Sequence, residues 1–249
     1  MKTACFALLL VALANGWAAD ISVGGVSVAV PNPHGFSPVT EKMVAVNDQL
    51  ILFVPPTSEQ LLAFIPDVDV PAALRGEIPQ MERRFVVQTL RGIVSLFLSG
   101  AEFQELKAVA KSQNAKIIEN AERKLPGITQ EINKGISDKY DVDLAFSVSQ
   151  ILPMPVHEES DRTLAYSAFV RFEMNDEFGN LTSNVAVVTA TFVHVRGKLL
   201  LLFAYAEESG LEWSKETSRQ WADSIVAANP PDAQTGMKEE QPSAVFRVD

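Results

Sequence analysis

Cysteine is almost absent from this sequence. Among its 249 residues the one cysteine is Cys5, which lies inside an apolar run at the start of the chain. Without that run the chain can form no disulfide, and it has no thiolate for catalysis or metal binding. Small secreted domains usually need disulfides, whereas a chain of this length can bury enough apolar surface to fold without them. If the protein is exported, this favours a bacterial periplasm over a eukaryotic extracellular space.

Clusters of basic residues are also missing. The chain has 21 lysines and arginines against 31 aspartates and glutamates, which gives a net charge of -10. Nucleic-acid binders present grouped lysines and arginines to the phosphates, and attachment to an anionic membrane surface needs a similar group. The composition therefore predicts no nucleic-acid partner and disfavours binding to membrane surfaces. A net negative charge is typical of a soluble protein.

The local motifs of the common enzyme classes do not occur. There is no G-x-S-x-G nucleophile elbow, no G-x-x-x-x-G-K-[ST] phosphate loop and no G-x-G-x-x-G after an expected strand. The three histidines, His34, His157 and His194, are too widely spaced to form a metal-ligand motif. We therefore assign no catalytic, cofactor-binding or metal-binding residue from the sequence, and we expect no cofactor.

Some polar residues nevertheless keep other hypotheses open. The segment 157–161 (HEESD) carries imidazole and carboxylate groups that could bind a divalent ion, but a solvated loop between two strands would need the same residues. His194, near an expected turn, could take part in catalysis, although half-exposed histidines at strand ends are common. Arg83, Arg84 and Arg91 could face an anionic ligand if their segment is a strand.

The start of the chain has the three parts of a secretory signal peptide. Lys2 provides the positive charge, residues 4–14 form the apolar core, and small residues precede two possible cleavage points, after Ala14 and after Ala18. The core is too short to span about 30 Å of hydrocarbon, and no other stretch is long and apolar enough. We expect residues 1–19 to be cleaved as a signal peptide and the protein to be exported, either to the periplasm or outside the cell, with no integral membrane segment left.

Proline and glycine divide the N-terminal half into short elements. β-branched residues predict a strand over 21–30, with Gly24-Gly25 as a bulge or bend inside it. Ser99 and Glu102, placed ahead of apolar residues, have the spacing of a capping box that begins a helix. The remaining patterns predict a helix over 43–54, strands over 61–65 and 83–91, and helices over 99–124 and 128–140.

In the C-terminal half the apolar period changes to two. Residues 144–148 and 164–172 alternate as strands do. Segments 185–195 and 199–205 form the clearest hairpin, with Arg196-Gly197 as a two-residue loop that places His194 opposite Leu199 and Val193 opposite Leu200. Both faces of this hairpin are apolar, so we expect helices on both sides of it.

These elements predict one domain over residues 20–229. The last helix is expected to begin at a capping box of Ser209 and Glu212, and it carries an apolar stripe for docking on the sheet, formed by Trp213, Thr217, Trp221 and Ile225. The fold class is α+β: a three-layer α/β/α sandwich with a mainly antiparallel sheet. Residues 230–249 are polar, and we expect a mobile tail that is dispensable for folding.

The order of these elements resembles that of the PsbP-like α/β/α sandwich proteins, a group of exported or lumenal proteins. The resemblance covers residues 20–229 and includes the break at Pro31-Asn32-Pro33, the following Gly35-Phe36, and a final helix with Trp213, Trp221 and Ser224-Ile225-Val226. The chain is similar too to uncharacterised exported bacterial proteins with segments like 84–89 (RFVVQT). The resemblance implies binding or assembly work on larger complexes, without a catalytic residue set.

We therefore expect an exported, non-catalytic binding or assembly module with a protein partner. Two alternatives stay open. One is a hydrolase-like enzyme whose site is gathered only by the fold, with His157, Glu158, Glu159 and His194 as its residues. The other is a small-ligand carrier with an apolar pocket between helix and sheet.

Overall fold

The structure is a computed structural model that describes residues 18–112, 145–175 and 180–231, together with parts of 123–138. Seven antiparallel strands in the order β3-β4-β5-β9-β8-β7-β6 form the main sheet of this part of the chain, and β1 and β2 form a separate hairpin. In chain order the elements are β1 (Ala18–Val23), β2 (Val26–Pro31), β3 (Phe36–Pro38), α1 (Val44–Leu52), β4 (Ser58–Pro66), α2 (Val70–Leu74), β5 (Arg84–Leu90), α3 (Gly100–Ser112), β6 (Ala145–Glu159), β7 (Thr163–Asn175), β8 (Leu181–Val195), β9 (Lys198–Glu207) and α5 (Leu211–Ala228).

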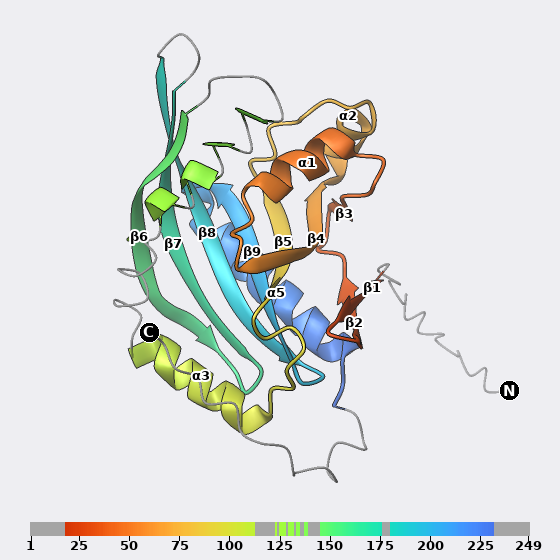
Figure 1. Ribbon diagram of the computed structural model, residues 1–249. Coiled ribbons are helices and arrows are strands. Elements are labelled where there is room, and N and C mark those ends of the chain that lie inside the picture. Colours follow the sequence, from red (N-terminus) through yellow and green to blue (C-terminus); the bar gives the residue numbers. More distant parts are fainter. Residues whose placement is uncertain are drawn as a thin grey trace, which may run out of the picture.

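One face of the sheet, here called the α5 face, is covered by α5 and the β1–β2 hairpin (Figure 1). Trp221 of α5 contacts the ring edges of Phe64 and Phe85, and its indole N–H donates to the Pro31 carbonyl at 2.8 Å. The core on this face also contains buried residues of β1, β2, β8 and β9. The α5 face is therefore sealed from solvent over the centre of the sheet.

The opposite face, here called the α1 face, is covered at two separate places. Near one end α1 and α2 pack on β4 and β5, where Val46 and Leu50 meet Ile65 and Val86. At the other end the start of α3 and the segment before it pack on the β8–β9 hairpin. In Figure 1 α1 lies in front of the sheet and α5 behind it. The three-layer α+β sandwich with an antiparallel sheet is confirmed.

Most of the expected elements are confirmed, including the register of the β8–β9 hairpin: His194 pairs with Leu199 and Val193 with Leu200. The capping box at the start of α3 is confirmed as well, because Glu102 accepts from Ser99 N–H at 2.8 Å while Ser99 Oγ accepts from Glu102 N–H at 3.2 Å. The alternating apolar pattern and the capping residues were sufficient to predict these elements from the sequence.

Three expectations were wrong. Gly24-Gly25 is not a bulge within one strand, because both glycines have positive φ and form the turn between β1 and β2. Segment 157–161 is not all loop, since β6 continues to Glu159; this strand is last in the sheet order and has irregular register, so it tolerates prolines. At α5 the cap position is Gly210, which forms no side-chain hydrogen bond, so Ser209 does not begin that helix.

Other expectations lie outside the described residues. These include most of the signal peptide over 1–19, nearly all of the tail over 230–249, and much of the helix over 128–140. They stay predictions. Among the described residues, no helix is long and apolar enough to cross a membrane.

Asn229 joins the end of α5 to β2. It is 2% exposed, its side-chain oxygen accepts from Ala29 N–H at 3.0 Å, and its amide nitrogen donates to the carbonyls of Ala29 and Ile225. Because Asn229→Ala leaves these partly buried groups unpaired, we expect a loss of about 2 to 3 kcal/mol in the free energy of unfolding. Urea denaturation measures this. The exposed control Asp223→Ala should lose less than about 1 kcal/mol, and equal losses in both variants would contradict the assignment.

Candidate docking surface

Two large apolar side chains project from the segment between β5 and α3, residues 91–98, here called the 91–98 loop. Leu96 is 45% exposed and Phe97 55% exposed. Ile93, Val94 and Leu98 of the same loop turn inward and pack on the core. The loop therefore has an apolar inner side and an apolar outer tip.

Backbone hydrogen bonds fix the path of this loop. Within it Ile93 N–H donates to the Leu90 carbonyl at 3.1 Å, and Leu96 N–H donates to the Ile93 carbonyl at 3.0 Å. At its end Leu98 N–H donates to the carbonyl of Gly197, in the β8–β9 turn, at 2.9 Å. The tip is thus held in one conformation by bonds on both sides of it.

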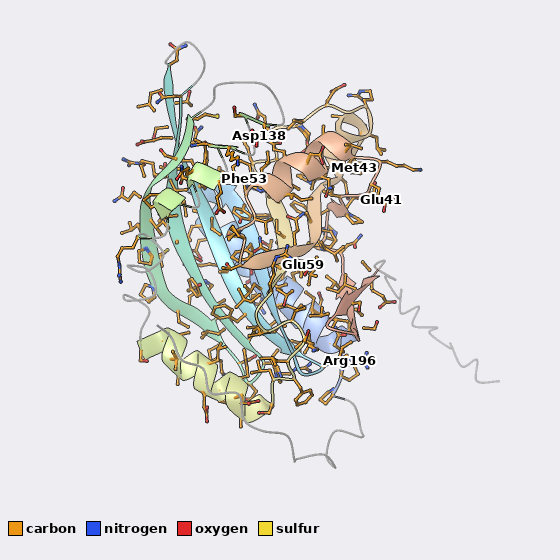
Figure 2. All side chains as sticks on the ribbon, viewed as in Figure 1. Glu41, Met43, Phe53, Glu59, Asp138 and Arg196 are labelled. Atoms are coloured by element: carbon orange, nitrogen blue, oxygen red, sulfur yellow. The ribbon has the colours of Figure 1, made fainter. Side chains whose placement is uncertain are left out.

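The loop rests on two hairpin turns, and each turn has a glycine at the contact. A β-carbon at Gly197 would collide with the ring of Phe97, and one at Gly24 would collide with the carbonyl of Val94. Both glycines also have positive φ, which other residues rarely adopt. Arg196, beside Gly197, lies at the lower end of the sheet in Figure 2, whereas Met43 and Phe53 lie at the upper end.

Lys198, the first residue of β9, connects the β8–β9 turn to the 91–98 loop. Its side chain is buried, with the residue 4% exposed, and its ammonium donates to the carbonyls of Val94 at 3.1 Å and Leu96 at 2.9 Å. In the part of the chain that the structure describes, no carboxylate pairs with it, and burial lowers the pKa of its ammonium. A buried ammonium costs free energy unless hydrogen bonds compensate it, and here two carbonyls of the loop provide those bonds.

His194 supports the other end of the loop and does not lie in an open site. Its ring stacks on Phe103 with centroids 5.2 Å apart, and Nε2 donates to the Leu98 carbonyl at 2.7 Å. A carbonyl can only accept, so this contact fixes the proton on Nε2. Burial lowers the pKa of His194, while the bond to Leu98 opposes the shift.

His157 does not join His194 in a common site. It lies on the α5 face, where Nε2 is 3.0 Å from the hydroxyl of Ser167, and that hydroxyl continues to Thr189 at 2.8 Å and from there to Ser214 at 2.6 Å. A serine beside a histidine can be a nucleophile and its base. Here Ser167 has no exposed surface and its oxygen is already bonded to a second hydroxyl, so a substrate cannot reach it.

One carboxylate of segment 157–161, that of Glu159, is engaged by α3. Glu159 forms ion pairs with Lys107 at 3.2 Å and Lys111 at 2.9 Å, both from α3, and their hydrogen bonds lower the pKa of the carboxyl. Lys107 donates in addition to the Ser160 carbonyl at 2.6 Å. No group of three metal-ligating side chains occurs among the residues that the structure describes. Segment 157–161 thus attaches α3 to the sheet.

The alternative of a small-ligand carrier requires an apolar pocket between helix and sheet, and two hollows in the structure can be compared with it. One, of about 520 Å³, lies between Leu125, Pro126 and Thr129 on one side and the β6 residues 147–151 on the other, and its lining mixes hydroxyl, amide and apolar groups. The other, of about 240 Å³, lies over the end of the sheet next to Arg171 and Glu208. Neither is the apolar cavity between helix and sheet that a carrier would need.

Comparison with known proteins gives similarity in structure alone. No family model and no curated protein sequence matches the chain. Cyanobacterial PsbP from Synechocystis sp. PCC 6803 is similar at 13% identity and a TM-score of 0.28, over 91% of this chain and 96% of that one. The Ran-binding protein Mog1p of Saccharomyces cerevisiae is similar at 11% identity and a TM-score of 0.32, over 85% of this chain and 93% of that one.

The weak resemblance to PsbP-like proteins is confirmed. At these TM-scores the similarity carries no argument about partners or activity, which must come from the residues themselves. Sequence reasoning missed Leu96 and Phe97. The available signal was an apolar run, residues 93–98, that lies between two glycines and follows neither a helical nor a strand period.

The buried histidines predict a loss of stability in mild acid. The pKa of both His157 and His194 is lowered by burial, so well above the ordinary value of about 6.5 both are neutral whether the chain is folded or unfolded. Below that pH the unfolded chain takes up protons first, and the free energy of unfolding falls until the pH passes the lower, folded pKa. His194→Gln keeps a donor for the Leu98 carbonyl and cannot titrate. We expect it to flatten the decline below pH about 6.5, and an unchanged dependence of the melting temperature on pH would contradict this.

Proposed function

We propose that this protein is an exported, non-catalytic binding module that docks on a partner protein through the tip of the 91–98 loop. The observation that carries the proposal is the pairing of two exposed apolar side chains, Leu96 and Phe97, with a loop held by hydrogen bonds on both sides. Protein interfaces concentrate their binding energy in a few large side chains of this kind.

The cost of this arrangement supports a binding role. Ordering a flexible loop on binding lowers affinity, and a loop fixed beforehand avoids that loss. The conformation of the 91–98 loop is fixed by the buried ammonium of Lys198 and by the glycines at two turns that the loop contacts. Burying an ammonium costs free energy by itself. Selection for stability alone would not hold an exposed phenylalanine in place by such means.

The charges next to the tip indicate the kind of surface that fits it. Arg91 is exposed at the base of the loop, where it is 3.7 Å from Glu59, and Arg196 occupies the adjoining turn. On a chain with a net charge of -10 these are local positive groups. We infer a partner surface with an apolar pocket for Phe97 and an acidic rim, which steers the encounter and fixes orientation.

Export predicts a defined mature N-terminus. The signal-peptide pattern places cleavage near Ala19, so the mature chain should begin at or near Asp20 and be recovered from the envelope or medium. This cut would remove the first residues of β1 but keep Ile21 and Val23, which face the core. Intact mass measurement of the protein from its native host tests this, and a mature chain that still contains Lys2 would contradict export by this route.

Docking predicts that the tip is needed for partner capture. Immobilised wild-type protein should retain one partner in stoichiometric amount from the native envelope extract, and the double variant Leu96→Ser, Phe97→Ser should retain at least about tenfold less. The matched control is Val68→Ser, which removes an apolar side chain that is 85% exposed at another site. Because all three positions are exposed, melting temperatures should change little.

Lys198→Met tests whether the fixed shape of the loop matters. The variant leaves the tip side chains in place but removes the bonds to the carbonyls of Val94 and Leu96. We expect faster hydrogen exchange at the amides of the loop and weaker capture of the same partner. Equal capture by the wild-type protein and the tip variant, or recovery of a stoichiometric small molecule without any protein, would contradict the proposed docking.

A further inference from the structure

The α5 face is left uncovered by α5 at the end of the sheet where this helix begins. Near its start Ser214 bonds to Thr189 of β8 at 2.6 Å, and further along the helix Ser218 is 2.8 Å from Thr191. The helix therefore runs away from Val185, which precedes Thr189 on the same face of β8. A hollow of about 240 Å³ lies over this end of the sheet.

Three strands form the floor of the hollow with two rows of side chains. In the first row Arg171 of β7 lies between Gln150 of β6 and Val185 of β8. In the second row Phe169 of β7 lies beside Leu152 of β6. Leu152 is 57% exposed, and both Phe169 and Val185 are half-buried. The apolar part of the floor is therefore accessible from solvent.

The hollow carries one positive and one negative side chain from different strands. Arg171 projects from β7, whereas Glu208 belongs to a short 3₁₀ helix, Glu208–Gly210, that follows β9. Because β8 lies between β7 and β9 in the sheet, the two charges approach the hollow from different sides. Both side chains are exposed. No ion pair joins them among the residues that the structure describes.

The polar side chains of the hollow are without partners in the described part of the chain. Arg171 is the one arginine there whose side chain has no hydrogen bond or ion pair; each of the others has at least one, as Arg219 has with Glu216. The side chains of Gln150 and Glu208, which line the same hollow, form none either. A guanidinium, an amide and a carboxylate are thus all available to one ligand.

We propose that this hollow binds a small zwitterion with an apolar body, of the chemical class of the free aliphatic α-amino acids. The guanidinium of Arg171 presents paired N–H donors that match a carboxylate, and the amide of Gln150 beside it supplies a further donor. The carboxylate of Glu208 accepts from the ammonium. The apolar body covers Leu152 and Phe169 and removes their surface from water. A ligand with a single charge would leave one of the two charged side chains without a partner.

The size of the hollow limits the ligand to a small molecule. Pockets for drug-sized ligands measure about 300 to 1,000 Å³, so about 240 Å³ suits a molecule as small as an amino acid. The hollow shares no residue with the 91–98 loop, which rests on the turn at the opposite end of β8. The inference therefore goes beyond the proposed docking, and its test needs no protein partner.

The test is an NMR titration of the full chain at neutral pH with leucine and with three molecules that each lack one of its features. 4-Methylpentanoate lacks the ammonium, 3-methylbutylamine lacks the carboxylate, and glycine lacks the apolar body. We expect leucine to bind with a dissociation constant of about 1 mM or tighter and to shift the amides of β6, β7 and β8 around the hollow. Each of the other three molecules should bind at least about fivefold more weakly.

Two variants separate the two charges. Arg171→Met should remove the advantage of leucine over 3-methylbutylamine, and Glu208→Gln should remove its advantage over 4-methylpentanoate. The control is Arg75→Met, which removes an exposed arginine that lies outside the hollow and pairs with Glu77, and it should bind leucine as the wild type does. Because all three substituted side chains are exposed, melting temperatures should change little.

Three results would overturn the proposal. One is a titration in which leucine shifts no amide around the hollow. Another is leucine binding that is unchanged in both Arg171→Met and Glu208→Gln. The last is binding of glycine or of either singly charged molecule as tightly as leucine.

Discussion

Between Ala186 and Glu207, β8 and β9 pair residue by residue, and both faces of this ladder are apolar. Such a ribbon must be covered on each side, which places α5 on one face and the α1 and α3 regions on the other. Its outer edges pair with β5 and β7, so the sheet grows in both directions from it. Its turn at Arg196-Gly197 supports the 91–98 loop. The register of this one hairpin therefore positions the layers, the sheet and the proposed docking surface.

The buried polar groups fall into two kinds. Under α5, hydroxyl groups of the helix meet hydroxyl groups of the sheet: Ser214 bonds to Thr189, and Ser218 is 2.8 Å from Thr191. These groups satisfy one another, so they specify where the helix sits at little cost. Lys198 and Arg84 are different, because each buries positive charge without a carboxylate among the described residues. For Lys198 we propose that it is kept because its bonds hold the docking loop.

The two faces of the sheet also differ in how completely they are covered. The α5 face is closed over the centre of the sheet, with fully buried strand residues from β5 to β7. The α1 face is closed near α1, where Tyr205 packs against the cluster under that helix, and near α3, while Val188 between these places is half-buried. The docking tip lies at the end of the sheet, beside the turn between β8 and β9.

The sequence by itself determined the elements and the hairpin register, because alternation, glycine turns and the Ser99–Glu102 cap act over a few neighbouring residues. It did not determine that β6 continues through 157–159, since position at the sheet edge is what permits its prolines. It also left Arg83, Arg84 and Arg91 equivalent; the partner of Arg83 is 124 residues away, and only the fold brings Glu207 to it. The exposure of Leu96 and Phe97 at the tip of the 91–98 loop was likewise decided by the fold. An apolar run without a period can turn inward or outward, and contacts with the distant residues Gly24, Gly197 and Lys198 decide which of its side chains stay in solvent.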